Sequence, residues 1–305
     1  MIANIFTTII VQPIFNLLVL IYSILPGHNF GLAIILFTIL VRLLMWPLVK
    51  KQLHHARAMR ELAPELKKIK KAAGGDRQKE SQLTMELYKE KEINPFASIG
   101  ILLVQVPILI GLYASLRRII NDPHQIITFS YSFLHHLPWL QTLTQDIHRF
   151  DDSLFGLVNL TRTAVETSGI YWPALAIVIA SAAAQYFQTK QLMPQNPQAR
   201  SLRSILSQAG QGKQADQAEV NAAVGKSTQY LIPFMVLIIS IRLAVALPLY
   251  WLASSLVAYI QQSRVLKHDA ALADASIGAQ PAKLIDSPEP AAKLRKKPAR
   301  RRRRK

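Results

Sequence analysis

Residues 30–49, FGLAIILFTILVRLLMWPLV, form an apolar run of 20 residues that contains a single charged side chain, Arg42. A helix rises about 1.5 Å per residue, so this run matches the roughly 30 Å hydrocarbon core of a bilayer. Three more apolar stretches of at least this length occupy residues 95–116, 169–189 and 230–260. The pattern predicts an all-α, polytopic membrane protein.

Charge is concentrated between the apolar stretches. The 305-residue chain is 50% hydrophobic, yet it has a formal net charge of +18. It has no cysteine, which excludes disulfides and thiolate metal sites. The histidine pairs at 54–55 and 135–136 lack the i, i+4 spacing of helical metal sites, and no phosphate-binding P-loop occurs. We therefore expect no metal, no cofactor and no enzymatic activity.

The distribution of Lys and Arg orients the chain. Residues 50–93 contain 12 of these side chains, 117–168 contain four, 190–226 contain five and 264–305 contain 13. Cytoplasmic loops carry the excess of positive charge, so residues 50–93 lie inside, and alternation places 117–168 outside and 190–226 inside. The basic C-terminal segment stays in the cytoplasm only if the long stretch 230–260 crosses the membrane twice.

We therefore expect a core of five transmembrane helices over residues 30–263, with a tight turn near Arg242–Leu247 joining the last two. Arg242 itself is expected to snorkel to the outer interface, and a second charge inside the core is the alternative. The expected spans are about 30–49, 95–116, 169–189, 227–243 and 246–263.

Residues 1–29 form a separate apolar segment with two open interpretations. The segment is interrupted by Pro13, contains no Lys or Arg, and lacks the basic start and small-residue cleavage site of a secretory signal. We expect a helix that lies in the outer interface with Asn16 and Tyr22 near its polar side. A further membrane span is the alternative of equal weight.

Residues 50–93 predict a cytoplasmic helical hairpin. Two charged helices, the first interrupted at Pro64, are separated by Gly74-Gly75-Asp76, and glycine tolerates the backbone angles that end a helix. The simpler interpretation is a solvated cap on the spans, and a partner-docking surface is the alternative. The stripe of apolar side chains at helical spacing consists of Leu62, Leu66, Ile69, Leu83 and Leu87.

The two remaining cytoplasmic segments lack a core-forming pattern. Residues 190–226 are rich in Gln, Ala, Ser and Gly and predict a mobile loop, and residues 264–305 predict a disordered basic tail. The tail would bind anionic lipid or RNA phosphate through contacts that salt weakens, and the two partners do not exclude each other. Its candidate contacts are Lys296, Lys297, Arg300, Arg301, Arg302, Arg303, Arg304 and Lys305.

Several motifs in order give the sequence a resemblance to YidC-type membrane protein insertases over roughly residues 12–263. The stretch NFGLAIILFTILVRLLMWPLVKKQ resembles that family's opening helix with its single arginine, and INPFASIGILLVQVPILIGLYASLR resembles its NP…Q-x-P…L-Y helix. ALAIVIASAAAQYFQTKQL and LYWLASSLVAYIQQ are similar to its last two motifs. Ser255 stands where the family usually has Asn, and LAVALPLYW lacks the usual glycine, so the departures from the family pattern lie in the last hairpin.

This resemblance implies a bacterial cytoplasmic-membrane protein that inserts nascent membrane proteins through a hydrophilic groove open to cytoplasm and lipid, and that also assists their folding. It implies a ribosome contact through rRNA phosphate at the tail, leaves the Sec translocon open as a partner, and makes a monomer sufficient. The large external domain of some members is absent, because only residues 117–168 are available for it. The groove residues it implies are Arg42, Gln105, Gln185, Gln188, Trp251 and Ser255.

Arg42 is the central candidate because a buried guanidinium is costly in a bilayer. It precedes Lys50 by eight residues, about 12 Å inside the cytoplasmic end of its helix, and no expected span contains a carboxylate to pair with it. From the residues alone, a groove charge and a side chain that snorkels or binds backbone carbonyls are equally supported, and the resemblance favours the groove. The rival function is a small anion transporter or channel that uses Arg42 as its binding charge.

Overall fold

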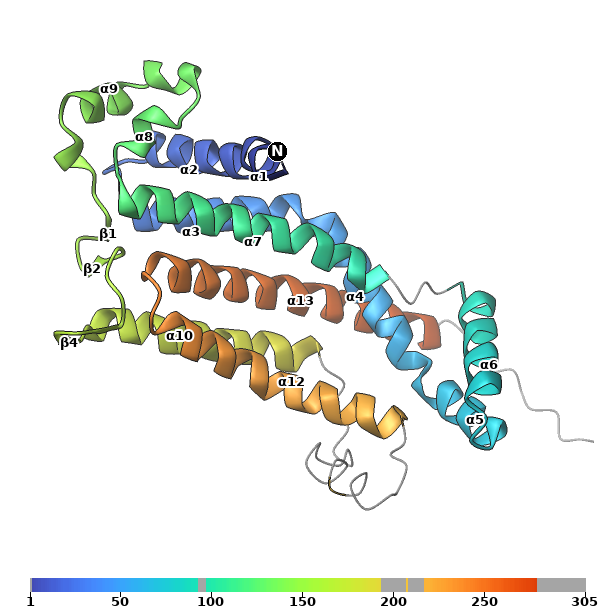
Figure 1. Cartoon of the computed structure of the whole chain (residues 1–305). Coiled ribbons are helices and arrows are strands. Elements are labelled where there is room, and N and C mark those ends of the chain that lie inside the picture. The colour runs from blue at the N-terminus through green and yellow to red at the C-terminus, as the bar shows by residue number, and fades with distance from the viewer. Residues whose placement is uncertain (1, 93–96, 193–206, 208–216, 279–305) are drawn as a thin grey trace, which may run out of the picture. The chain divides into compact units, whose positions relative to one another are not determined.

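Long helices make up most of the chain, which confirms the expected all-α class (Figure 1). The computed structural model describes residues 2–92, 97–192, 207 and 217–278. The chain divides into a unit of residues 1–266 and a second unit of residues 267–305. The long helices and their N-terminal extension are α1 Ile2–Phe6, the π-helix η1 Thr7–Val11, α2 Gln12–Ile24, α3 Phe30–Leu44, α4 Trp46–Glu61, α5 Ala63–Ala73, α6 Arg77–Glu90, α7 Ala97–Asn121, α10 Trp172–Leu192, α12 Gln217–Ser240 and α13 Ala246–Gly278.

The expected single helix over residues 30–49 is wrong, because the chain bends by 59° between α3 and α4. Pro47 explains the break. It has no N–H to donate to the carbonyl of residue 43, and its ring clashes with that carbonyl in a continuous helix. The structure ends α3 at Leu44 and leaves Met45 as its cap.

By length and composition, one helical stretch of the described residues, Asn4–Ile24, is sufficient to cross a membrane by itself. The bent pair of Phe30–Leu44 and Trp46–His55 makes a second crossing if both parts belong to one span. Gln229–Ser240 is a shorter apolar helix. The other expected spans overlap with α7, α10, α12 and α13, but these helices begin or end at residues that differ from the expected ones.

The N-terminal helix packs against the core through small residues. A side chain at Gly111 of α7 would place its Cβ 2.7 Å from Cδ1 of Ile14, so any residue larger than glycine would force the isoleucine side chain to shift. Ser115 Oγ of α7 donates to the carbonyl of Val11, the last residue of the π-helix, at 3.3 Å. The helix thereby joins a core that also contains buried side chains of α3, α7 and α13.

Asn16 and Tyr22 do not face a membrane interface as expected. Both side chains are buried, and both contact the segment that follows α7. The amide oxygen of Asn16 accepts from the backbone N–H of Tyr131, and the hydroxyl of Tyr22 accepts from the backbone N–H of Asp151. The two polar groups therefore attach the N-terminal helix to residues 121–171.

The segment between α7 and α10 contains short helices and strands. Its two small antiparallel sheets pair Ser153 with Asn159 and Val165 with Ile170. Leu154 packs closely against the first turn of α3. A Cβ added at Gly31 would lie 2.9 Å from the Cα of Leu154. The elements are α8 Gln125–Thr128, η2 Ser132–His136, α9 Pro138–Gln145, η3 Ile147–Arg149, β1 Ser153–Leu154, β2 Val158–Asn159, β3 Val165–Glu166 and β4 Gly169–Ile170.

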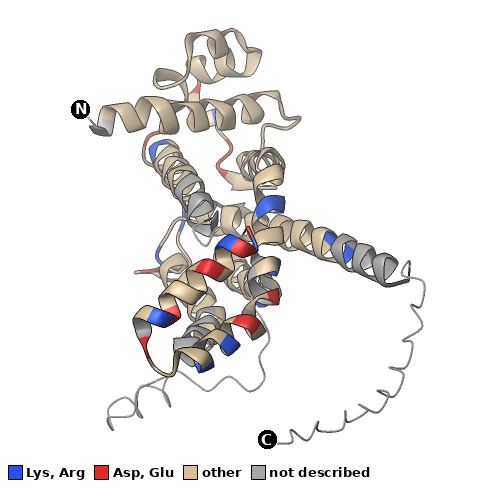
Figure 2. Ribbon diagram, turned by 90° about the vertical axis from the view of Figure 1, so that its right-hand side faces the viewer, with Lys and Arg blue, Asp and Glu red and all other residues tan. Residues whose placement is uncertain are grey.

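Residues 50–92 contain the two expected charged helices, with mixed charges on their surface (Figure 2). The first is divided between the end of α4 and α5, and the second is α6. Gly74 ends α5 in the left-handed conformation with φ of 60°, and the Asp76 carboxylate caps α6 by accepting from two backbone N–H groups. Pro64 lies in the first turn of α5 and separates it from α4, as expected. Lys91 Nζ lies 3.4 Å from the Glu65 carboxylate.

The last two helices form the expected hairpin, but both are longer than expected. The turn lies between Ser240 and Ala246, and α13 continues to Gly278 instead of ending near residue 263. The expectation of a disordered segment is therefore wrong for residues 264–278. Alanine is the strongest helix former, and residues 264–278 contain four alanines and no proline.

Candidate functional site

Arg42 lies in the last turn of α3, and its guanidinium binds one side chain of α13. Nε and Nη2 donate to the Ser254 hydroxyl at 3.0 and 2.6 Å. Arg42 is half-buried, and Ser254 is only 5% exposed. A guanidinium has five N–H donors, so Ser254 occupies two and leaves three. Within the described residues, no carboxylate pairs with Arg42.

The Arg42 side chain points away from the end of α3 where α4 begins. Its own carbonyl accepts from the Gln261 amide at 3.0 Å, whereas its guanidinium binds Ser254, seven residues earlier on α13. Seven helical residues rise about 10 Å. A side chain that snorkelled toward the charged helices α4 to α6 would point the other way, so the snorkelling interpretation does not describe this geometry.

The direction of α3 and α13 follows from contacts at their first residues. Asn29 caps the start of α3 and donates to the Asp151 carboxylate at 2.9 Å. The N–H of Ala246, the first residue of α13, donates to the Leu160 carbonyl at 3.1 Å. Both helices therefore start at the segment 151–171 and run the same way from it, and the guanidinium points back toward that segment.

Tyr250 and Gln105 complete the surroundings of Ser254. The side chains of Ser254 and Gln105 both lie near the buried Tyr250 phenol. Three helices thus contribute: α3 brings Arg42, α7 brings Gln105, and α13 brings Tyr250 and Ser254. Of the expected site residues, Arg42 and Gln105 belong to this cluster.

Ser255 connects α13 to a second neighbour, α10. Its hydroxyl donates to the Gln185 side-chain oxygen at 3.0 Å, and the Gln185 amide donates to the Thr189 hydroxyl at 3.2 Å. Two adjacent serines of α13 therefore bind two different helices. The expected residues Gln185 and Ser255 are paired with each other and not with Arg42.

Gln188 and Trp251 are not in either cluster. Gln188 has no hydrogen bond within the ranges that the structure describes, and Trp251 packs, partly buried, against the hydrophobic core. The tail candidates between Lys296 and Lys305 lie outside the described residues. Across the described ranges, no three His, Asp or Glu side chains gather to hold a metal ion.

Three functional candidates were missing from the sequence interpretation: Ser254, Tyr250 and Gln261. A signal for two of them exists, because Ser254 and Gln261 are seven residues apart and so share one face of a helix. Ser255 and Gln262 repeat the same spacing on the adjacent face. The side-chain oxygens of Gln261 and Gln262 are buried and have no hydrogen-bond partner in the described part of the chain.

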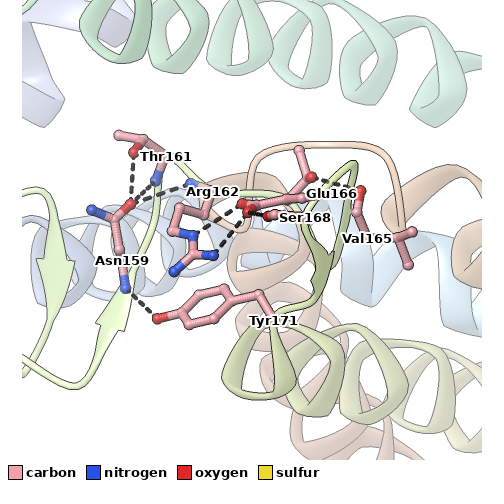
Figure 3. Close-up of polar contacts among 8 residues, drawn as sticks. Asn159, Thr161, Arg162, Val165, Glu166, Ser168 and Tyr171 are labelled. Carbon is pink, nitrogen blue, oxygen red and sulfur yellow. Dashed lines mark hydrogen bonds and ion pairs between the residues drawn. The ribbon is translucent and has the colours of Figure 1, made fainter.

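A polar network holds the segment 159–171 together next to the α12–α13 turn (Figure 3). Arg162 forms two hydrogen bonds to the Glu166 carboxylate, at 3.0 and 2.8 Å, and its guanidinium lies 4.1 Å from the centre of the Tyr171 ring. These bonds lower the pKa of Glu166 and raise the pKa of Arg162. The backbone of the segment binds the turn, because Val245 N–H donates to the Arg162 carbonyl and Val165 N–H to the Ile241 carbonyl.

Comparison with known proteins identifies the family. A model of the 60Kd inner membrane protein family matches residues 20–271, which is most of the chain. The chain belongs to this family. A family relative named membrane protein insertase YidC from Fusobacterium nucleatum is 30% identical over 242 residues, which are 79% of this chain and 88% of the relative.

Other relatives of the same name match a shorter part. The one from Oleidesulfovibrio alaskensis is 38% identical over 142 residues, which cover 45% of this chain and 25% of the relative. The one from Tolumonas auensis is 44% identical over 115 residues, which cover 38% of this chain and 21% of the relative. The chain thus matches a quarter or less of these two longer members of the 60Kd inner membrane protein family, and the resemblance inferred from its motifs is confirmed.

Proposed function

We infer that the chain is a membrane protein insertase of the YidC type, acting on nascent membrane proteins in the cytoplasmic membrane. Membership of the 60Kd inner membrane protein family carries this conclusion, together with the insertase relative that aligns over most of both chains. The comparisons give no support to the alternative, an anion transporter or channel.

We propose that α3, α7, α10 and α13 enclose a hydrophilic groove lined by Arg42, Gln105, Gln185 and Ser255, with Gln188 and Trp251 at its margins. The two polar clusters on α13 support this proposal. A chain entering a bilayer must desolvate its charges and unpaired backbone groups, and a wet groove shortens the apolar distance over which it does so. The apolar part of the chain then leaves sideways into lipid.

Arg42 would receive an acidic side chain of the substrate. Its three remaining N–H donors support this role, as does the lack of a carboxylate partner among the described residues. The polar contacts of segment 151–171 with α3, α13 and the α12–α13 turn support closure of the groove at the outer side. The opposite end, where α4 begins, would be open to the cytoplasm.

The membrane topology is also a proposal: five spans over residues 30–263, a cytoplasmic hairpin over 50–93, an external segment 117–168, a cytoplasmic loop 190–226 and a cytoplasmic tail. The distribution of Lys and Arg supports it. Basic residues 296–305 would contact ribosomal RNA phosphate or anionic lipid, and the Sec translocon is a further candidate partner.

A crosslinking experiment tests the groove. A photo-activated side chain at position 185 should crosslink to a ribosome-bound nascent membrane segment during insertion into vesicles that contain the protein. A matched probe at position 238, an exposed apolar position on α12, should crosslink mainly to lipid. Equal nascent-chain crosslinking at both positions would contradict a groove between α10 and α13, and failure of the vesicles to insert any substrate would contradict the insertase function itself.

A further inference from the structure

We propose that Ser254 is a positioning residue that sets the depth at which Arg42 meets the substrate. The proposal rests on the insertase function proposed above. Ser254 lies in the LYWLASSLVAYIQQ motif, where the sequence assigned it no role, and its hydroxyl is the acceptor for two of the Arg42 donors at 3.0 and 2.6 Å.

The two ends of Arg42 are held at two levels of α13. Gln261 binds the Arg42 carbonyl, which lies where α3 ends at the Pro47 break and where helix carbonyls lose their intrahelical partners. Ser254 binds the guanidinium and lies seven residues before Gln261 on α13, closer to the segment 151–171. The backbone carbonyl and the guanidinium of Arg42 are therefore held by two different residues of α13, and the guanidinium is kept at the level of Ser254.

Without the Ser254 hydroxyl, the preferred position of the guanidinium changes. The guanidinium then loses the acceptor that holds it at this level of the groove, and a long Arg side chain near a helix end gains hydration by extending toward bulk water. The nearest polar region in the proposed topology is the end of α3 at which α4 begins. Arg42 would then turn around and move toward the cytoplasm by up to about 10 Å, the rise of seven helical residues.

Ser255 provides a matched control. It is adjacent to Ser254 in the chain and equally buried, but its hydroxyl binds Gln185 of α10 and not Arg42. A Ser255→Ala variant removes the same group from the same helix at the same level. A Ser254→Thr variant keeps the hydroxyl and should behave as the wild type.

The first measurement reports the position of the Arg42 guanidinium and does not require insertion of a substrate. The protein in vesicles is treated from the cytoplasmic side with phenylglyoxal, a water-soluble reagent for guanidinium groups, and modification of Arg42 is followed by mass spectrometry. Ser254→Ala should raise the rate several-fold, while Ser255→Ala and Ser254→Thr stay near the wild-type value. A wild-type rate in Ser254→Ala overturns the proposal.

The second measurement reads the consequence for the substrate. A single Asp is moved one residue at a time along the translocated end of a test substrate, and the position that inserts fastest is determined. In Ser254→Ala the optimum should shift by up to about three residues of extended chain, since each spans about 3.3 Å. An unchanged optimum overturns the proposal.

The two measurements separate this proposal from the proposed function. If the wild-type vesicles insert no substrate, the insertase function fails, and the phenylglyoxal rates still decide the role of Ser254. If insertion occurs and both readouts stay unchanged in Ser254→Ala, the insertase function stands and the role of Ser254 is refuted.

Discussion

Replacing Arg42 with Ala should slow the insertion of substrates that carry an acidic residue near their translocated end. The guanidinium has three donors left after its two bonds to Ser254, so a substrate carboxylate can form charge-assisted hydrogen bonds with it. The substitution removes these bonds. A neutral substrate does not use them, so its insertion should change little.

The size of the effect follows from the bonds at stake. A hydrogen bond to a charged group contributes about 1.5–3 kcal/mol, and each 1.4 kcal/mol changes a rate constant about tenfold. Loss of one such bond should therefore slow insertion of the acidic substrate by about 10- to 100-fold. Arg42→Lys should fall between wild type and Ala, because it keeps the charge but loses the planar fork of donors.

The assay compares two versions of one substrate, with Asp or Asn at the same position, inserted into vesicles that contain each variant. Arg242→Ala is the matched control, since Arg242 is the other arginine within the apolar stretches and its side chain is exposed at the α12–α13 turn. It should leave both rates unchanged. If Arg42→Ala slows the Asp and Asn substrates equally, the reasoning about charge is refuted.

Three further predictions follow from other contacts. Gly111→Ala should destabilise the detergent-solubilised protein by about 1–3 kcal/mol, measured by thermal unfolding, because its Cβ would clash with Ile14; the neighbouring exposed change Ile110→Leu should have no such effect. The Arg162–Glu166 pair stabilises the folded segment above the ordinary pKa of Glu, and this contribution is lost as the pH falls through the lowered pKa of Glu166. The protection factor of the Val245 N–H, which is its hydrogen-exchange rate compared with the intrinsic rate at the same pH, should therefore fall in acid, and in Glu166→Gln this acid-dependent fall should disappear; an identical pH dependence of the protection factor in both proteins would contradict it. Deleting residues 293–305 should preserve insertion of a test substrate but reduce ribosome co-sedimentation, and the binding that the full chain shows should weaken steeply with salt; a flat salt response would exclude phosphate contacts.

The sequence predicted the helices where one physical signal dominated. Gly74 and Asp76 specified the hairpin turn because each has a direct conformational role there, and the turn after Ser240 followed from the balance of charge between loops. The bend at Met45 was missed although Pro47 was visible, because the apolar run was counted as one span. The extension of α13 was missed because residues 264–278 were grouped with the basic C-terminal segment and predicted to be disordered with it.

The site was predicted less completely than the fold. Arg42 was identified because a charge in an apolar run is conspicuous, and Gln105, Gln185 and Ser255 followed from the resemblance. Ser254 was overlooked because a serine in an apolar helix gives a weak signal until its partner is known. The direction of the Arg42 side chain depends on how α3 and α13 align, which no local pattern in the sequence encodes.

Adjacent serines on α13 have a consequence for the tightness of the membrane. Ser254 is hydrogen-bonded to Arg42 and Ser255 to Gln185, so polar side chains of α13 are bonded to the neighbouring helices α3 and α10. A polypeptide that enters the proposed groove would bind the three free N–H donors of Arg42 and would have to compete with Gln185 for the Ser255 hydroxyl. In the proposed groove, these bonds would hold α13 against α3 and α10 and so disfavour a continuous water path for protons or ions across an energised membrane when no polypeptide is bound.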